Sequence, residues 1–440
     1  MKAFFRTIIL ADNKKIRLLP ALVITLALVA PTIVNGAGLE GFQNWLSDNY
    51  RTEFNGFIEA RAGARLQDDP YQEDASIGEL RLQIDLGSDL DWAIFKLKGD
   101  LLTDLVTEEA GAELREFNLA FSPLEMMDAK LGRQVLTWGT GDLLFINDLF
   151  PKDWESFFIG RDDEYLKGPS DALKSSFFLD AFDLDLVYVP EFNGSVYIDG
   201  SRISYWNGLQ SRSAGQDFIF VDDERNRFFR DDEVHLRLAK NISGLELGIY
   251  GYHGFWKTPE GVLLTGPKLF YPGLAVGGAS IRTTMLGGIT NVELGYYDSL
   301  DDRGGNDPLV RNSELRLLTG FERELARDFT GGFQYYLEFM QDYDEYEQTA
   351  NPATRKDEFR HLLTIRLTKL LLNQNLRLSL FAYYSPSDED GYLRPKFNYK
   401  VNDQLAIDGG MNWFFGSEDH TFFGQFEDAS NIYAGIRWNL

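Results

Sequence analysis

The sequence of 440 residues contains no cysteine, so disulfide bonds and thiolate metal sites cannot contribute to its structure. No segment rich in proline or serine marks a linker between domains. After residue 50, no apolar run is long enough to form a membrane-spanning helix. The net charge of −25 argues against nucleic acid as a partner, because phosphates would be repelled. These absences leave one long domain built from short elements.

The first residues have the composition of a secretory leader. Basic residues precede an apolar run over 18–34, and small residues follow before Ala37. This pattern predicts a signal peptide over residues 1–36, with an uncleaved membrane anchor as the alternative. Residues 37–51 would then form a short periplasmic N-terminal segment.

The rest of the chain alternates between apolar and polar residues. At 80–86, for example, leucine or isoleucine occupies every second position. In an extended strand this spacing puts the apolar side chains on one face. Eighteen segments show the pattern: 52–66, 77–86, 90–102, 112–122, 126–135, 171–179, 182–189, 233–239, 244–256, 270–284, 287–298, 311–325, 328–340, 357–369, 374–385, 391–401, 404–415 and 429–440.

The connections between these segments alternate in length, which a soluble sandwich has no reason to do. Short turns are expected at 87–89, 326–327, 371–373 and 402–403, and long polar stretches at 67–76, 190–232, 341–356 and 416–428. Outer-membrane barrels have tight periplasmic turns and long external loops. The last segment ends on the apolar Leu440, which resembles the C-terminal signature by which such barrels are recognised for assembly. The sequence therefore predicts an all-β, transmembrane, antiparallel up-and-down barrel of about 18 strands (16 to 18) over 52–440, in the bacterial outer membrane.

Residues between the apolar positions would line the lumen. Basic residues gather on the first and last segments, which are neighbours in a closed barrel. They predict a basic wall of Arg61, Arg65, Arg81, Arg377, Arg394, Lys396, Lys400 and Arg437. Two interpretations remain open. Opposite charges can satisfy each other inside a water-filled barrel, or their separation can draw anionic solutes into the pore.

One irregular stretch, 136–170, follows the fifth segment and combines glycine, large aromatic and acidic residues. An external loop has little use for so many aromatic residues, whereas a loop folded into the barrel must pack against its wall. In general porins the third external loop folds inward and narrows the pore, and this stretch resembles it in position and composition. We expect a constriction formed by Arg133, Gln134, Trp138, Gly139, Gly141, Asp142, Asp148 and Asp153.

The motif Leu131-Gly132-Arg133-Gln134 resembles the Gly-Arg-Gln motif of alginate-export-like barrels. In related porin-like families this strand runs into a Trp-Gly turn, as it does here at Trp138-Gly139. The resemblance implies an 18-stranded outer-membrane barrel with a basic lumen. It rests on a short motif and does not identify alginate as the substrate.

Motifs for catalysis are missing: the sequence has no HExxH, P-loop or GxSxG pattern. The four histidines, at 235, 253, 361 and 420, form no recognisable pair with a nucleophile. We therefore expect no enzyme activity, no metal site and no cofactor. The acidic stretches 222–224 and 342–347 could coordinate Ca²⁺, but solvated external loops are the favoured interpretation.

The sequence favours a porin-like channel for passive passage or export of a hydrophilic solute or polysaccharide. The solute would be anionic if the residues of the basic wall are not paired with acidic residues. The alternatives are a plugged barrel serving as a surface scaffold or adhesin, and the outer-membrane component of a lipid export system. Expected partners are outer-membrane lipid and lipopolysaccharide, the barrel-assembly machinery and the small solute itself. An export pore would add periplasmic export partners.

Overall fold

The structure is a computed structural model, and it describes residues 36–264 and 268–440. The predicted signal peptide over 1–36 lies outside the described residues, apart from Gly36. The segment predicted at 37–51 forms a helix, α3 (Gly36–Tyr50), which precedes the first strand. Within the described ranges, no helix is both long and apolar enough to cross a membrane.

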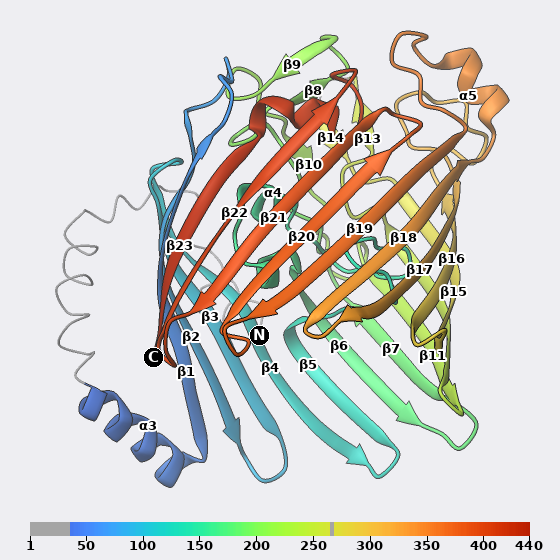
Figure 1. Cartoon of the computed structure of the whole chain (residues 1–440). Coiled ribbons are helices and arrows are strands. Elements are labelled where there is room, and N and C mark those ends of the chain that lie inside the picture. Colours follow the sequence, from blue (N-terminus) through green and yellow to red (C-terminus); the bar gives the residue numbers. More distant parts are fainter. Residues whose placement is uncertain (1–35, 265–267) are drawn as a thin grey trace.

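Eighteen antiparallel strands form one closed barrel (Figure 1). Each barrel strand pairs with the one before it and the one after it, and β1 pairs with β23 to close the ring. The predicted barrel is therefore confirmed. Its strands are β1 (Thr52–Arg65), β2 (Ala75–Asp89), β3 (Ile94–Asp104), β4 (Glu109–Leu124), β5 (Met127–Val135), β6 (Pro169–Phe178), β7 (Asp183–Val189), β11 (Glu233–Ile242), β12 (Leu245–Phe255), β15 (Gly273–Met285), β16 (Gly288–Ser299), β17 (Glu314–Ala326), β18 (Phe329–Met340), β19 (Phe359–Leu371), β20 (Leu376–Ser385), β21 (Asp390–Lys400), β22 (Leu405–Gly416) and β23 (Asn431–Asn439).

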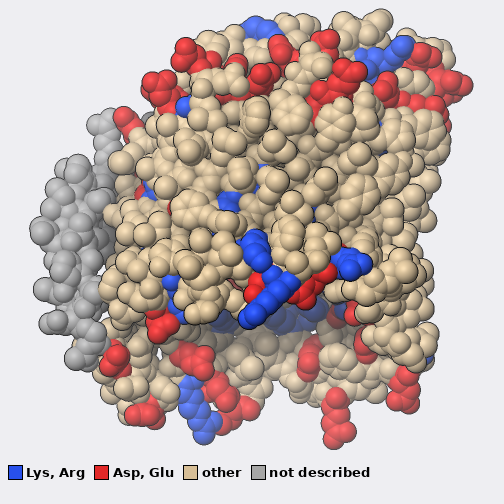
Figure 2. Space-filling model, in the orientation of Figure 1, with Lys and Arg blue, Asp and Glu red and all other residues tan. Residues whose placement is uncertain are grey.

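The alternation along the strands turns the apolar side of the sheet outward. In β16, for example, Val292 and Leu294 are exposed, whereas Glu293 between them is buried. A band of uncharged side chains accordingly covers the middle of the outer surface in Figure 2. Such a band matches the hydrocarbon layer that surrounds a transmembrane barrel. The barrel is therefore placed in the bacterial outer membrane.

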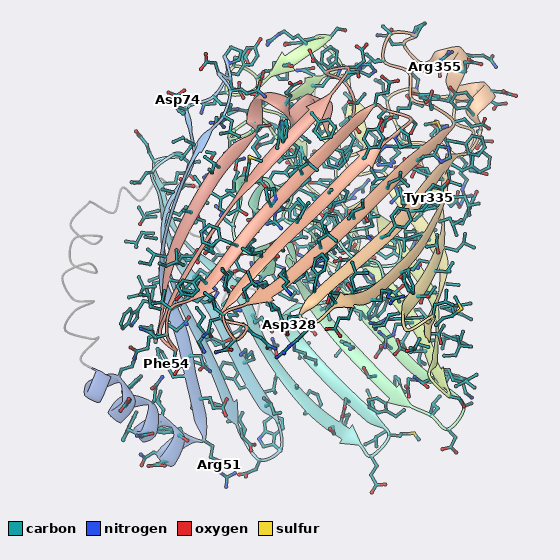
Figure 3. The ribbon with its side chains drawn as sticks, in the orientation of Figure 1. Arg51, Phe54, Asp74, Asp328, Tyr335 and Arg355 are labelled. Carbon is teal, nitrogen blue, oxygen red and sulfur yellow. The ribbon has the colours of Figure 1, made fainter. Side chains whose placement is uncertain are left out.

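Connections are short at one end of the barrel and mostly long at the other. Two-residue turns join β4 to β5, β11 to β12, β15 to β16 and β17 to β18, whereas loops 136–168 and 190–232 lie at the opposite end. In Figure 3, Asp328 marks the short-turn rim, and Asp74 and Arg355 mark the long-loop rim. By the usual topology of such barrels, the long-loop end is external and the short-turn end is periplasmic.

The first periplasmic turn differs from its prediction. The residues at 87–89 continue β2 and pair with β3, so the predicted turn there is wrong. The chain reverses at 90–93, where Asp91 has a φ of 68° and the Leu90 N–H donates to the Ala93 carbonyl at 2.8 Å. Aspartate tolerates this left-handed conformation, which explains why the turn can form three residues later.

The long external connections contain short elements of their own. These are α4 (Trp154–Ile159) and a 3₁₀ turn (Asp163–Leu166) in loop 136–168; β8 (Tyr205–Asn207), β9 (Arg212–Ala214) and β10 (Asp222–Asp223) in loop 190–232; β13 (Gly261–Leu263) and β14 (Lys268–Phe270) before β15; α5 (Tyr343–Thr349) before β19; and a 3₁₀ turn (Gly424–Ala429) before β23.

Candidate functional site

Loop 136–168 leaves the wall after β5 and returns at the adjacent strand β6, yet it contacts the far side of the barrel. The Asp142 N–H donates to Gln334 Oε1 of β18, and Gln334 Nε2 donates to the Asp142 carbonyl, both at 2.8 Å. The Asp142 carboxylate also pairs with Arg366 of β19 at 2.5 Å. Since β18 and β19 lie nearly half the ring away from β5, the loop crosses the lumen.

The turn at 138–142, irregular in sequence, wraps around one carboxylate of the wall. Glu293 of β16 is buried and accepts two successive backbone N–H groups, the second from Gly141 at 2.7 Å. Asn147 Nδ2 donates to the same carboxylate at 3.0 Å. Gly139 has a φ of +82°, and a Cβ there would lie 3.1 Å from Glu293 Oε1. Successive N–H groups form an anion-binding concavity, and here the protein supplies the anion itself.

Two aromatic residues of the loop enclose a histidine of the wall. Phe150 stacks on His235 of β11 with ring centroids 4.4 Å apart, and Trp138 packs edge-on against it at 6.0 Å. All three side chains are buried. His235 therefore acts as a packing surface that holds the beginning of the loop, and Trp138 lies against the wall at this point.

Helix α4 holds the middle of the loop against the last strands. Asp153 caps its first turn by accepting a backbone N–H at 2.8 Å, and Gly160 ends it with a φ of 90°. The Phe158 carbonyl accepts hydrogen bonds from Asn412 Nδ2 and Asn431 Nδ2 at 2.8 and 3.0 Å. The carboxylate of Asp153 is thus used for helix capping.

Three consecutive acidic residues near the end of the loop pair with basic side chains of the first and last strands. The pairs are Asp162–Arg437 (3.5 Å), Asp163–Arg394 (2.7 Å), Asp163–Lys396 (3.4 Å) and Glu164–Lys98 (2.9 Å). Acidic loop residues therefore oppose basic wall residues. These acids lie within the predicted loop but outside the predicted set of constriction residues.

Arg133 and Gln134 belong to strand β5 and not to the loop. Gln134 is buried and donates to the Ala172 carbonyl at 3.0 Å. Arg133 points to the other side, because side chains alternate along a strand. It pairs with Asp171 at 3.5 Å on the face that carries the exposed Leu131. The placement of Arg133 in the constriction is therefore wrong, since the strand continues to Val135.

Asp148 is also placed differently from the expectation that it faces the pore. Its carboxylate is buried, pairs with Lys152 Nζ at 3.1 Å and accepts the Thr137 hydroxyl at 2.7 Å. It therefore stabilises the interior of the loop. Of the three acidic residues expected at the constriction, Asp142 is the one that pairs with a basic residue of the barrel wall.

The basic residues of the first strands are paired within the wall. Arg61 NH1 lies 2.8 Å from Asp408, and its Nε lies 3.2 Å from Glu59. Arg81 NH1 lies 2.7 Å from Asp100. Both arginines are buried, so these pairs neutralise the charge that the sequence suggested was free.

Three other members of the predicted basic wall lie at the rims. Arg65, at the external end of β1, donates to the Arg202 carbonyl at 2.5 Å. Arg377 is exposed near the periplasmic end of β20. Lys400 pairs with Asp403 of the adjacent turn at 2.8 Å. The expected wall is therefore not one continuous free basic surface, and the ion pairs match the interpretation in which lumen charges satisfy each other.

A cavity of about 1170 Å³ lies between the wall and the inward loops at the external end. Its wall side is formed by β2, β3, β4 and their connections. Seven acidic and two basic residues line it: Glu73, Asp74, Asp104, Glu108, Glu109, Glu113 and Glu155, with Arg161 and Arg202. We call this cavity the acidic vestibule.

The two arginines of the acidic vestibule are both engaged. Arg202 of loop 190–232 pairs with Asp104 of β3 and, at 3.3 Å, with Glu155 of α4. Arg161 pairs with Glu79 of β2 at 2.5 Å. These pairs tie both inward loops to the wall, and the remaining acidic residues give the lining a net negative charge.

Apolar side chains of the two loops and the wall pack together inside the external half of the barrel. Ile203, Tyr205 and Ala214 of loop 190–232 join Phe157 and Phe158 of loop 136–168 in one buried apolar cluster. Inward aromatic residues of the wall, with Trp256 just beyond β12, complete this cluster: Tyr252, Tyr297, Tyr336, Phe381, Tyr383, Tyr392, Phe414 and Tyr433. The two loops are therefore held by packing as well as by charge.

Few of the contacts that hold the loop could be found in the sequence. Glu293 is visible there only as one of several lumen-facing glutamates, and nothing marks it as the residue that binds the 138–142 turn. Three other contact residues are uncharged polar residues at inward positions of the strands: Gln334, Asn412 and Asn431. Such residues indicate only weakly that a strand position binds a loop. In the part of the chain that the structure describes, no group of three or more His, Asp or Glu side chains could hold a metal ion.

No protein-family model and no curated protein matches this sequence. Solved structures of outer-membrane proteins share its architecture, and two of them illustrate the likeness. OccAB3 of Acinetobacter baumannii aligns over 88% of this chain and 99% of its own, with 10% identity and a TM-score of 0.54. OccK5 (OpdH) of Pseudomonas aeruginosa aligns over 88% of this chain and 98% of its own, with 9% identity and a TM-score of 0.54.

The chain has the fold of outer-membrane porins. At such low identity the likeness concerns the barrel architecture alone.

Proposed function

We propose that this chain is a porin-like channel through which small hydrophilic solutes cross the outer membrane passively. The observation that supports it is loop 136–168, which crosses the lumen from β5 and is anchored on the far side of the barrel by Glu293, Arg366 and Arg394. A loop held in this way narrows a wide barrel to a selective passage.

The lining favours cationic or neutral solutes over anionic ones. The basic residues that suggested an anionic solute are paired with Asp408, Asp100 and Asp163, among others. The acidic vestibule, in contrast, is net negative at the external entrance. A cleft lined by one sign of charge raises the local concentration of ions of the opposite sign.

Export of a polysaccharide, as the alginate-export-like motif suggested, fits this interior less well. A polyanionic chain would have to pass both the acidic vestibule and the packed aromatic cluster. A component of a lipid export system would meet the same obstacle. Small solutes could pass without displacing the aromatic cluster, so they are the substrate class that we propose.

A plugged barrel that serves as a surface scaffold is the second candidate, and the buried aromatic cluster of the external half favours it. Single-channel recording of the folded barrel in planar bilayers separates the two functions. The channel proposal expects discrete conductance steps. In a KCl gradient it expects a reversal potential with the same sign as the equilibrium potential of K⁺, because cations would pass more readily than anions. Folded barrels that insert without conductance would refute the channel and leave the scaffold.

A further inference from the structure

Helix α3 lies outside the barrel, beside the periplasmic end of β1 (Figure 1). The Phe42 ring packs edge-on against Phe54 of β1 with centroids 5.8 Å apart, and Gln43 Nε2 donates to the Phe54 carbonyl at 3.2 Å. Figure 3 labels Phe54 at this end of β1, next to the helix. The helix therefore contacts the outer wall near the start of β1 and does not enter the lumen.

Phe54 belongs to the face of β1 that meets lipid. It is paired with Leu86 of β2, and side chains of opposite parity on β1, such as Glu59 and Arg61, are buried in the lumen. Because side chains alternate along a strand, Phe54 points outward. By packing on Phe54, Phe42 extends the apolar outer surface of the barrel onto α3.

The helix has one apolar and one polar face. At 3.6 residues per turn, Leu39, Phe42, Trp45, Leu46 and Tyr50 share one side, whereas Glu40, Asn44, Ser47 and Asp48 share the other. Asn49 is the polar residue on the apolar side, and its amide donates to the Trp45 carbonyl at 2.8 Å. Three aromatic rings remain uncovered: Phe42 is 45% exposed, Trp45 49% and Tyr50 57%. They form a continuous patch, with the Trp45 centroid 6.2 Å from Phe42 and 5.1 Å from Tyr50. We name it the α3 aromatic patch.

The position and composition of this patch identify its occupant. Tryptophan and tyrosine concentrate where a transmembrane barrel meets the membrane interface. Helix α3 lies at the short-turn, periplasmic end of the barrel, beside the start of β1. With 15 residues, α3 is too short to span the bilayer, so its apolar face can be buried by lying along the surface. Three rings are also too small an area for a stable contact with a second copy, which needs about 1,000 Å² or more.

We propose that α3 is an interfacial anchor in the periplasmic leaflet of the outer membrane, with the α3 aromatic patch inserted among phospholipid chains. Glu40 and Asp48 then face the periplasm. The anchor covers the outer side of β1 next to the seam with β23, and it fixes the depth of this part of the wall in the bilayer. This proposal depends only on the barrel fold and is independent of the channel function proposed above.

Spin labels on single cysteines test this proposal, and the absence of native cysteine leaves each label as the sole modified thiol. Phe42→Cys and Trp45→Cys report on the apolar face, and Asn44→Cys and Asp48→Cys report on the polar face of the full-length barrel. The barrels are placed in liposomes of phosphatidylethanolamine and phosphatidylglycerol. Ile249→Cys, at an outward position of β12 that is 58% exposed, supplies the reference for a lipid-facing label.

Electron paramagnetic resonance then measures collisions with oxygen, which concentrates in lipid, and with a nickel chelate, which stays in water. We expect oxygen collisions to exceed nickel collisions several-fold at positions 42, 45 and 249, and the opposite at 44 and 48. Similar nickel access at all four α3 positions would place the helix in the periplasm and overturn the proposal. Low access of both reagents at 42 and 45, with broadening that disappears on dilution with unlabelled protein, would identify a second copy instead.

Discussion

Glu293 accepts the backbone N–H of Gly141 at 2.7 Å, although 152 positions separate the two residues in the chain. The carboxylate belongs to β16 and the N–H belongs to a turn that leaves the barrel wall at β5. The shape of that turn is therefore set by a charge on a distant strand. This contact makes the position of the loop sensitive to a single side chain.

The substitution Glu293→Gln tests this contact. The amide retains the size of the side chain but removes the negative charge that the turn surrounds. We expect the free energy of unfolding to fall by about 1–3 kcal/mol, the usual cost of poorly satisfied buried donors. The loop should also become mobile, with a larger and noisier single-channel conductance. Glu322→Gln, an exposed glutamate of neighbouring β17, is the matched control; equal effects of both would contradict the special role of Glu293.

Gly160→Ala tests the contact between the end of α4 and the wall. Gly160 has a φ of +90°, and a Cβ there would lie 2.2 Å from Tyr433 Cδ1. We expect a loss of about 2–4 kcal/mol, because overpacking adds to the backbone strain. Gly244 has a φ of +88° with open space around it, so Gly244→Ala should show the strain alone, about 1 kcal/mol. Urea unfolding of both variants measures the difference, and equal losses would rule out the clash.

A double-mutant cycle on Asp163 and Arg394 measures how strongly the loop is bound to the last strands. The side chain of Arg394 is 4% exposed and that of Asp163 is 44% exposed, so solvent screens part of the attraction. We expect a coupling energy of about 1 kcal/mol between Asp163→Asn and Arg394→Gln. The rim pair Arg51–Asp91, at 62% and 79% exposure, should show coupling close to zero. A coupling at Asp163–Arg394 no larger than at this rim pair would mean that the ion pair does not hold the loop.

Neutralising the acidic vestibule should reduce cation preference. We expect the combined change Glu108→Gln, Glu109→Gln and Glu113→Gln to move the reversal potential in a KCl gradient toward zero. The shift should be smaller in 1 M salt, where the screening length falls to about 3 Å. The control, Glu345→Gln with Glu347→Gln in α5, removes acidic charge away from the cavity. An equal shift of the reversal potential in the control would mean that cation preference comes from the overall charge of the protein and not from the acidic vestibule.

Stability should depend on pH at Asp428, in the external loop before β23. Burial raises the pKa of Asp428, and the carboxylates of Asp69, Glu427 and Asp419 raise it further. A carboxyl group with a raised pKa in the folded state stabilises it only while protonated, so this stability is lost as pH rises from 3.8 through the raised value. Asp428→Asn should therefore raise the melting temperature more at pH 7 than at pH 3. An equal change at both pH values would contradict the raised pKa.

The barrel could be predicted from the sequence because lipid outside and polar contacts inside impose a two-residue period on every strand. The alternation of Val292, Glu293 and Leu294 is readable without any tertiary information. Turn positions are less certain. At 87–89, Gly-Ser-Asp has turn composition, but the same residues fit the end of a strand, and β2 continues through them.

The site was only partly predictable, since ion-pair partners depend on the path of the loop in space. Asp148 and Asp163 are equally plausible as pore-facing acids in the sequence. In the structure the fold around α4 directs Asp163 to Arg394, whereas Asp148 turns inward to Lys152. No local pattern distinguishes these outcomes, because Arg394 lies more than two hundred positions away.

The pairing of β1 with β23 has a consequence for assembly. The seam runs from Phe57–Asn439 to Arg65–Asn431, so the ring cannot close until β23 is present to pair with β1. Asp162 of the inner loop pairs with Arg437 of that final strand, which also pairs with Glu59 of the first. Closure of the ring and binding of loop 136–168 are therefore coupled through Arg437. A chain truncated before β23 would keep two unsatisfied strand edges and would leave this loop contact unmade.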